Sequence, residues 1–225
     1  MLTVISVVFM VLGGLLSQRL KSKIEQYSAV PIDNGMTGAE IAHSMLKFYG
    51  INDVEIIQVP GQLTDHYNPQ NKTVNLSPEV YSGRNISAAA VSAHECGHAV
   101  QHATQYSMLQ FRSAMVPIVN IAANVQQYIF MLGIGMLANF GPTMLIFALI
   151  VFGITAAFSL VTLPVEFDAS RRALAWLDSS RVVQGEKHEG AKDALFWAAM
   201  TYVCAAAASL VQFLYLLAKL MNQRR

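Results

Sequence analysis

The sequence predicts a mainly α-helical, polytopic membrane protein with about four transmembrane helices and a small α+β domain. Charged residues make up 13% of the 225 residues, about half the usual share for a soluble domain, and the mean hydropathy is +0.40. Asp, Glu, Lys and Arg are absent from three long stretches, residues 1–18, 113–165 and 194–218. The chain is long enough for one ordinary domain, so the polar segments between these stretches must form a single small one.

Each charge-free stretch is long enough to cross a bilayer, whose apolar core of about 30 Å needs roughly 20 residues of helix. The middle stretch is long enough for two crossings, and the turn sequence Asn139-Phe140-Gly141-Pro142 divides it. The first stretch lacks the basic residues and the cleavage site of a signal peptide, so we expect an anchor. The expected crossings are residues 2–19, 115–138, 143–163 and 197–218.

The charge distribution predicts which side the polar segments occupy. With four crossings, segments 20–114 and 164–196 lie on one side of the membrane. That side holds twelve of the fifteen Lys and Arg residues when Arg19, at the end of the first crossing, is included. Positive charge favours the cytoplasm, so we expect a multi-pass plasma-membrane protein with these segments inside the cell. A formal net charge of +1 argues against a nucleic-acid partner. Only two cysteines occur, which gives no disulfide framework.

The segment from Asn85 to His102 is predicted to be a helix that carries a metal site. Asn85 or Ser87 can cap it, and an alanine-rich body follows. Its motif His94-Glu95-Cys96-Gly97-His98 fits HExxH, in which two histidines on one helical face bind zinc. Glu95 then projects close to the metal and can take a proton from a water that zinc activates. A buried ion pair or satisfied core histidines could produce the same pattern. Cys96 is expected to serve packing, and Gly97 to admit a neighbouring strand.

A catalytic zinc needs a third protein ligand, and the sequence offers several candidates. His102 is too far along the helix from His94, about 12 Å, for all three histidines to bind one ion. Glu166 is the strongest candidate, because a carboxylate at the end of an apolar crossing is costly unless it is paired or bound to a cation. An interfacial Glu166 paired with Arg171 or Arg172 would be the structural alternative. Asp168 is a rival ligand or, like His102, a residue that orients a ligand.

Three sequence motifs resemble those of the YugP-type membrane zinc metallopeptidases. They are 94–101 (HECGHAVQ), 63–69 (LTDHYNP) and 163–173 (LPVEFDASRRA). That family is similar to the HtpX-like gluzincins, whose zinc site is two histidines of HExxH plus a downstream Glu. The resemblance implies zinc bound by His94, His98 and Glu166, and a zincin-like catalytic domain with endopeptidase activity. The HtpX-like pattern has an Asp four residues after that Glu, whereas this chain has Ser170, so Asp168 would take the orienting role.

Residues around the motif helix suggest how a substrate is held. Segments 54–59 and 72–76 read as two strands of a small hairpin, which could pair with an extended peptide. The Asp65-His66-Tyr67 triplet between them is functional by resemblance, although loop residues in a turn would look the same. His66 or Tyr67 could donate to the oxyanion, as could Arg171. We expect one long helix over 108–137. Its first half should be shielded from lipid, because amide side chains in a crossing face protein or a wet cavity; these are Asn120, Asn124, Gln126 and Gln127.

The sequence therefore predicts a membrane-embedded zinc endopeptidase that hydrolyses peptide bonds near the membrane surface, with Glu95 as general base. Its partners would be a peptide or membrane-protein substrate and the lipid bilayer. One alternative is a non-catalytic membrane scaffold, whose structural zinc would need four protein ligands. Another is a small transporter or channel subunit, in which HExxH would have no role.

Overall fold

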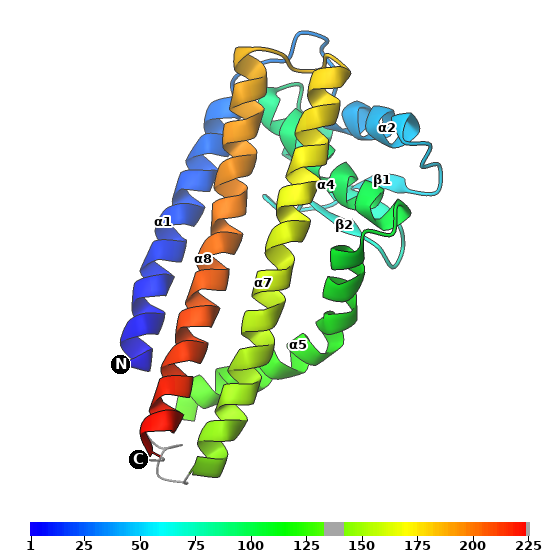
Figure 1. The fold of residues 1–225 in the computed structure, drawn as a ribbon. Coiled ribbons are helices and arrows are strands. Elements are labelled where there is room, and N and C mark those ends of the chain that lie inside the picture. The colour runs from blue at the N-terminus through cyan, green and yellow to red at the C-terminus, as the bar shows by residue number, and fades with distance from the viewer. Residues whose placement is uncertain (133–141, 224–225) are drawn as a thin grey trace. The chain divides into compact units, whose positions relative to one another are not determined.

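The computed structural model describes residues 1–132 and 142–223, which form long helices and one small sheet (Figure 1). The helices are α1 (Leu2–Ser28), α2 (Gly38–Phe48), α3 (Pro78–Ser82), α4 (Ile86–Ala103), α5 (Ser107–Leu132), α7 (Pro142–Ser179) and α8 (Glu186–Gln223). The strands are β1 (Glu55–Gln58), β2 (His66–Asn68) and β3 (Thr73–Leu76). The mainly helical prediction is confirmed.

The chain divides into two compact units, and the three longest helices contribute to both. The first unit comprises residues 1–15, 110–164 and 201–225, and the second comprises residues 16–109 and 165–200. The first unit has its own apolar core, which includes Leu2, Leu145, Phe152 and Leu216. A hydrogen bond from Gln212 Nε2 to Ser6 Oγ, 3.3 Å long, joins α8 to α1 within this unit.

Three described helices are long and apolar enough to cross a membrane: Leu2–Ser28, Thr143–Ser179 and Glu186–Asn222. They contain the expected crossings 2–19, 143–163 and 197–218, and each runs further than expected. The described part of α5 is not among them. The rest of the expected crossing 115–138, and the turn at 139–141, lie outside the described residues.

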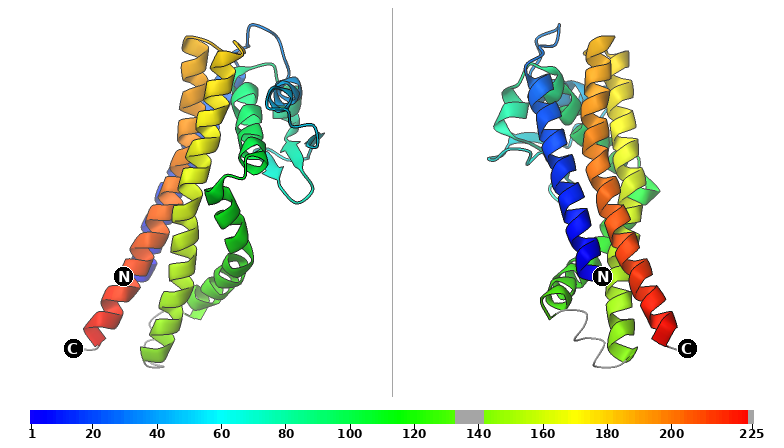
Figure 2. Two further views of the ribbon diagram at one scale, coloured as in Figure 1. Left: turned by 45° about the vertical axis from the view of Figure 1, so that its right-hand side comes forward. Right: turned by 90° about the vertical axis from the view of Figure 1, so that its left-hand side faces the viewer.

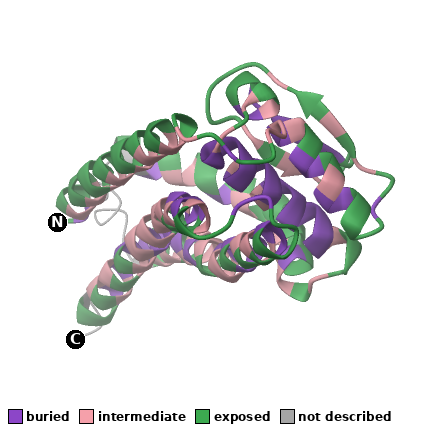
Figure 3. Ribbon diagram, turned by 90° about the horizontal axis from the view of Figure 1, so that it is seen from above, coloured by how far each residue is buried: buried purple, intermediate pink, exposed green. Residues whose placement is uncertain are grey.

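The second unit surrounds α4, the HExxH helix, with helices and the three-stranded sheet. Its core combines α2, β3 and α4 with apolar residues of α7 and α8, among them Ile41, Val74, Val100 and Leu177. Figure 3 shows buried residues gathered on the central helices, whereas α1 is largely exposed. Only Leu2 of α1 is buried. An apolar helix with so little protein cover is suited to a lipid environment.

The sheet differs from the expected hairpin of segments 54–59 and 72–76. Both strands form, as β1 and β3, but they pair in parallel, with Glu55 opposite Thr73. The antiparallel hairpin joins β3 to β2 instead, with Tyr67 opposite Val74, so the order is β1-β3-β2. The expectation was wrong because β2 has only three residues, too few to show an alternating pattern within a turn-rich segment.

The segment 164–196 is also more regular than expected. It consists of the end of α7, a short turn, and the beginning of α8. α1 and α8 lie side by side in Figures 1 and 2, and Asp193 of α8 joins them. Its carboxylate accepts hydrogen bonds from Tyr27 (2.7 Å) and Trp197 (3.1 Å) and pairs with Lys23 (2.7 Å). These contacts fix α8 against the polar end of α1.

Gly97 places α4 directly against the backbone of α7. A Cβ atom at position 97 would lie 2.6 Å from the carbonyl oxygen of Ala169. The sequence predicted that Gly97 admits a neighbouring element, and that element is a helix rather than the expected strand. The close approach brings the HExxH helix within reach of residues 165–170.

We predict that Gly97→Ala destabilises the protein by about 1–3 kcal/mol, because the backbone of α7 must move to admit the methyl group. Gly14→Ala in α1 is the matched control, since nothing lies within 4 Å of its added Cβ. Thermal unfolding of the detergent-purified proteins should show a lower midpoint for Gly97→Ala alone. Equal midpoints for both variants would contradict the close packing of α4 on α7.

Candidate metal centre

α4 begins at a well-formed cap and carries the motif through the middle of the second unit. The Asn85 side chain caps the helix by accepting a hydrogen bond from the Ala88 N–H, 2.9 Å long. The expected capping residue is thus confirmed, and the alternative Ser87 is buried inside the helix. Cys96 is buried and packs with its Sγ 3.6 Å from the Ala42 carbonyl oxygen, so its thiol serves packing as expected.

Two histidines of α4 and one glutamate of α7 converge on a single point. The Nε2 atoms of His94 and His98 lie 3.3 and 3.5 Å from Oε2 of Glu166. All three potential ligand atoms lie within 4.8 Å of one another. Ligands about 2.0–2.1 Å from a tetrahedral ion are about 3.3–3.4 Å apart, so these spacings fit a zinc ion.

The other ring nitrogen of each histidine is already engaged. Nδ1 of His94 lies 3.1 Å from the Ser170 hydroxyl, and Nδ1 of His98 lies 3.0 Å from Oε1 of Gln101. The amide oxygen can only accept, so His98 donates from Nδ1, which leaves Nε2 as the ring nitrogen available to a metal ion. Ser170 can accept in the same way from His94. This tautomer is the one that a metal-binding imidazole requires.

The metal-free site holds protons where a metal ion would bind. Burial disfavours the charged form of His98, but the adjacent Glu166 carboxylate outweighs burial and raises the pKa of His98. A metal ion must therefore displace a proton from this site. Its binding should weaken as the pH falls and His98 takes up a proton.

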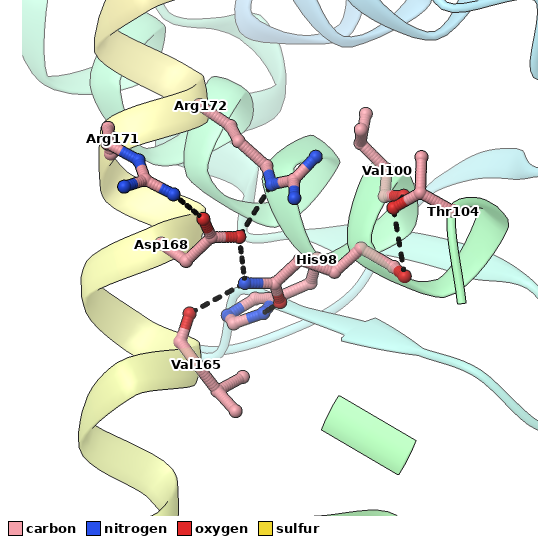
Figure 4. Close-up of polar contacts among 8 residues, drawn as sticks. His98, Val100, Thr104, Val165, Asp168, Arg171 and Arg172 are labelled. Atoms are coloured by element: carbon pink, nitrogen blue, oxygen red, sulfur yellow. Dashed lines mark hydrogen bonds and ion pairs between the residues drawn. The ribbon is translucent and has the colours of Figure 1, made fainter. Parts of the chain in front are cut away.

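Gln101 connects the histidine pair to α7. It is fully buried, and its Nε2 donates to the Val165 carbonyl oxygen (2.8 Å) and to Asp168 (2.9 Å). Figure 4 shows Arg171 and Arg172 converging on the same Asp168 carboxylate. Asp168 therefore reaches His98 only through Gln101. Of the two carboxylates considered as ligands, only Glu166 belongs to the converging group.

Tyr67 of β2 holds Glu95 and His102 of α4 at the same time. The main-chain N–H of Tyr67 donates to Glu95 Oε2 (2.8 Å), and the phenol oxygen lies 2.7 Å from Nδ1 of His102. Burial, together with the charge of Asp53, raises the pKa of Tyr67 to about 12, so the phenol keeps its proton. His102 thus anchors β2 to the helix and is not one of the converging ligands.

The remaining predicted residues do not belong to the group of converging ligands. His66 is exposed, and its Nδ1 lies 2.7 Å from the Thr64 carbonyl oxygen. Arg171 has a side chain 77% exposed and pairs with Asp168. Asp65 accepts hydrogen bonds from the N–H and hydroxyl of Ser77, so it anchors the chain before β2. The structure brings neither His66 nor Arg171 to the ligands.

Sequence reasoning missed two residues that orient the histidines, Gln101 and Ser170. Both could have been found from helical spacing. Gln101 is three residues after His98, which places the two side chains on one face of α4. Ser170 is four residues after Glu166, so it also faces α4. Its hydroxyl occupies the position where the resembled pattern has an Asp.

Together, the histidine pair, the buried carboxylate and the apolar helices define a membrane-associated, metal-binding helical protein. Residues 2–221 match the family described as "Putative neutral zinc metallopeptidase". The protein "Putative membrane protease YugP" of Bacillus subtilis (strain 168) is 41% identical over 208 residues, which cover 92% of this chain and 90% of that protein. No solved structure gives a significant match. The chain belongs to this zinc metallopeptidase family, and zinc is the cofactor that its donor set fits.

We predict that Gln101→Leu weakens zinc binding about 10- to 100-fold, because His98 loses its orienting partner and α4 loses its bond to Val165. Thr104→Val is the control, since that hydroxyl bonds only to carbonyl groups of its own helix. Competition with a fluorescent chelator measures the affinity. Equal affinities in Gln101→Leu, Thr104→Val and the parent would exclude this role for Gln101.

Proposed function

We propose that the protein is a zinc-dependent endopeptidase that hydrolyses peptide bonds near the membrane surface. The observation that carries the proposal is the triad of His94, His98 and Glu166, with Glu95 beside it on the same helix. Three protein ligands leave one position of a tetrahedral ion for water, which is the arrangement of catalytic zinc. Endopeptidase activity rests on the resemblance and accords with the name of the relative from Bacillus subtilis.

Glu95 is suited to the role of general base. When bound, zinc would lower the pKa of a water molecule and polarise the scissile carbonyl. Glu95 accepts the proton of that water and passes it to the leaving amine. The Tyr67 N–H holds one carboxylate oxygen, which fixes the side chain while leaving the other oxygen to receive the proton. His94 and His98 keep their Nε2 lone pairs toward the metal throughout.

The side of β2 away from β3 is the proposed position of the substrate backbone, and there the Tyr67 carbonyl can accept a hydrogen bond. Residues of a strand point their N–H and carbonyl groups alternately to its two sides, and Tyr67 directs its N–H to Glu95, away from β3. The Tyr67 carbonyl therefore also points to the side where Glu95 lies. An extended peptide that pairs with this edge would pass beside the base.

The shared unit of α4 and α7 supports four crossings. Residues 165–200 pack with residues 16–109, so the metal ligands of both segments lie on one side of the membrane. If α7 crosses, its beginning lies on the opposite side, and the chain between α4 and α7 must cross as well. The segment 115–138 would supply that crossing. The Lys and Arg distribution then places the centre at the cytoplasmic face.

The alternative of a structural zinc in a membrane scaffold has less support. A structural site is closed by four protein ligands and is commonly rich in cysteine. Within residues 1–132 and 142–223, only one group of three or more potential ligands converges, and it has no cysteine. Cys96 packs against Ala42 instead. The open coordination position favours catalysis.

We predict that Glu95→Gln retains about one zinc and lowers the cleavage rate about 10²- to 10⁴-fold, the usual contribution of a general base. Detergent-purified parent and variant are compared on unfolded casein, with zinc quantified in both. Internal fragments among the products would identify an endopeptidase. Chelation should abolish parental cleavage and added zinc should restore it. A parent that holds zinc but cleaves nothing would support the scaffold.

We predict that Glu166→Ala loses zinc, whereas Asp168→Asn retains about one ion with lower affinity. Glu166 supplies a ligand atom, but Asp168 acts only through Gln101, and an Asn oxygen can still accept that hydrogen bond. Metal content after dialysis separates the two cases. Retention by Glu166→Ala together with loss in Asp168→Asn would make Asp168 the ligand.

A further inference from the structure

A second groove lies on the side of the sheet away from the metal centre. It has a volume of about 890 Å³ and runs between α2 and β1. This volume is within the range of ligand-binding sites. The apolar residues that line it are Met36, Ala39, Val54, Ile56, Ile57 and Tyr81. Polar residues, including His43 and Glu55, also line it.

The groove contains an open strand edge. The N–H of Glu55 donates to the Lys72 carbonyl and that of Val59 to the Leu76 carbonyl, so odd-numbered residues of this segment face β3. The N–H and carbonyl of Ile56 therefore point the other way. In the described part of the chain, β1 is the outer strand of the sheet and no strand pairs with this edge.

An open strand edge selects one kind of ligand, in a groove whose lining combines apolar residues with charged ones such as Glu40, Glu55 and Arg84. Its outward N–H and carbonyl groups match those of an extended polypeptide, which can add to the sheet as a further strand. Proteins usually protect such edges with charges, prolines or bulges. β1 has a single charged residue, Glu55, and the side chain of Ile57 remains 37% exposed. The edge is therefore available for pairing.

We propose that the groove between α2 and β1 is a second polypeptide-binding site, which takes an extended, unfolded segment of the substrate by strand addition at Ile56. The identity of the ligand as substrate rests on the proposed peptidase function. β1 and β2 are opposite edges of the sheet, about 10 Å apart at the usual strand spacing. The bound segment is thus distinct from the one at Glu95, and the site selects long, unfolded chains over short peptides.

The test removes one main-chain donor. Ile56→Pro deletes the outward N–H and leaves the hydrogen bonds to β3 in place, since proline is tolerated where the N–H faces away from the sheet. Ile56→Ala is the matched control, because it loses the side chain but keeps the N–H. We expect KM for unfolded casein to rise about five- to tenfold in Ile56→Pro only, with cleavage of a six-residue peptide unchanged. An unchanged KM in a folded Ile56→Pro protein overturns the proposal.

A second variant covers the case in which Ile56→Pro does not fold. Ala39→Trp fills the groove from α2 and leaves the sheet untouched. Binding of fluorescent unfolded casein is measured by anisotropy in the Glu95→Gln background, so it requires no cleavage. Weaker binding by Ala39→Trp supports the site even if the parent cleaves no substrate. Lack of cleavage by the parent would contradict only the peptidase proposal. Equal binding by Ala39→Trp and its Glu95→Gln parent overturns the site.

Discussion

The contact between α4 and α7 is the constraint on which the metal centre depends. Histidines at positions 94 and 98 come from one helix, and the carboxylate that completes the triad comes from another, more than 60 residues later in the chain. Gly97 removes the side chain that would separate the two backbones, and Gln101 ties them by a hydrogen bond to the Val165 carbonyl. Since the donating and accepting atoms of Gln101 are both used, its amide fixes the helix spacing and the His98 ring together.

Burial of Glu166 explains why positive charge is favoured beside it. A carboxylate in low dielectric is costly unless a cation or several donors compensate it. Two imidazoles lie beside its buried side chain, and their Nδ1 atoms are engaged elsewhere. Glu166 raises the pKa of His98, so a divalent cation bound between these side chains would replace a proton. Glu166 itself lies just where the apolar run of α7 ends.

Much of this site could be predicted from the sequence, and the remainder depends on tertiary contacts. His94, Glu95 and His98 follow a local spacing that helix geometry fixes, and Glu166 stands out because charge is rare in its surroundings. The partners of the ligands leave weaker signals, since Ser170 and Gln101 are ordinary polar residues on helices. The sheet was mispredicted at β2, because three residues carry no measurable periodicity. The parallel pairing of β1 with β3 depends on tertiary contacts, which the local sequence does not reveal. The role of His66 stays a prediction, since its side chain is exposed and a strand turns adjacent side chains to opposite faces.

The metal ligands and the general base of the proposed reaction are positioned by different contacts. The metal ligands depend on the packing of α4 against α7, whereas the base depends on β2, through the Tyr67 N–H. The same tyrosine reaches His102 with its phenol, seven residues beyond Glu95, so it contacts α4 two turns apart on one face. This double contact sets the angle of β2 along the helix without using any metal ligand. Changes at Tyr67 or His102 should therefore alter the position of the base and the strand edge while zinc stays bound. Changes at Gln101 or Gly97 should instead weaken zinc binding and leave the position of Glu95 unchanged. Metal content and cleavage therefore have to be measured side by side in every variant.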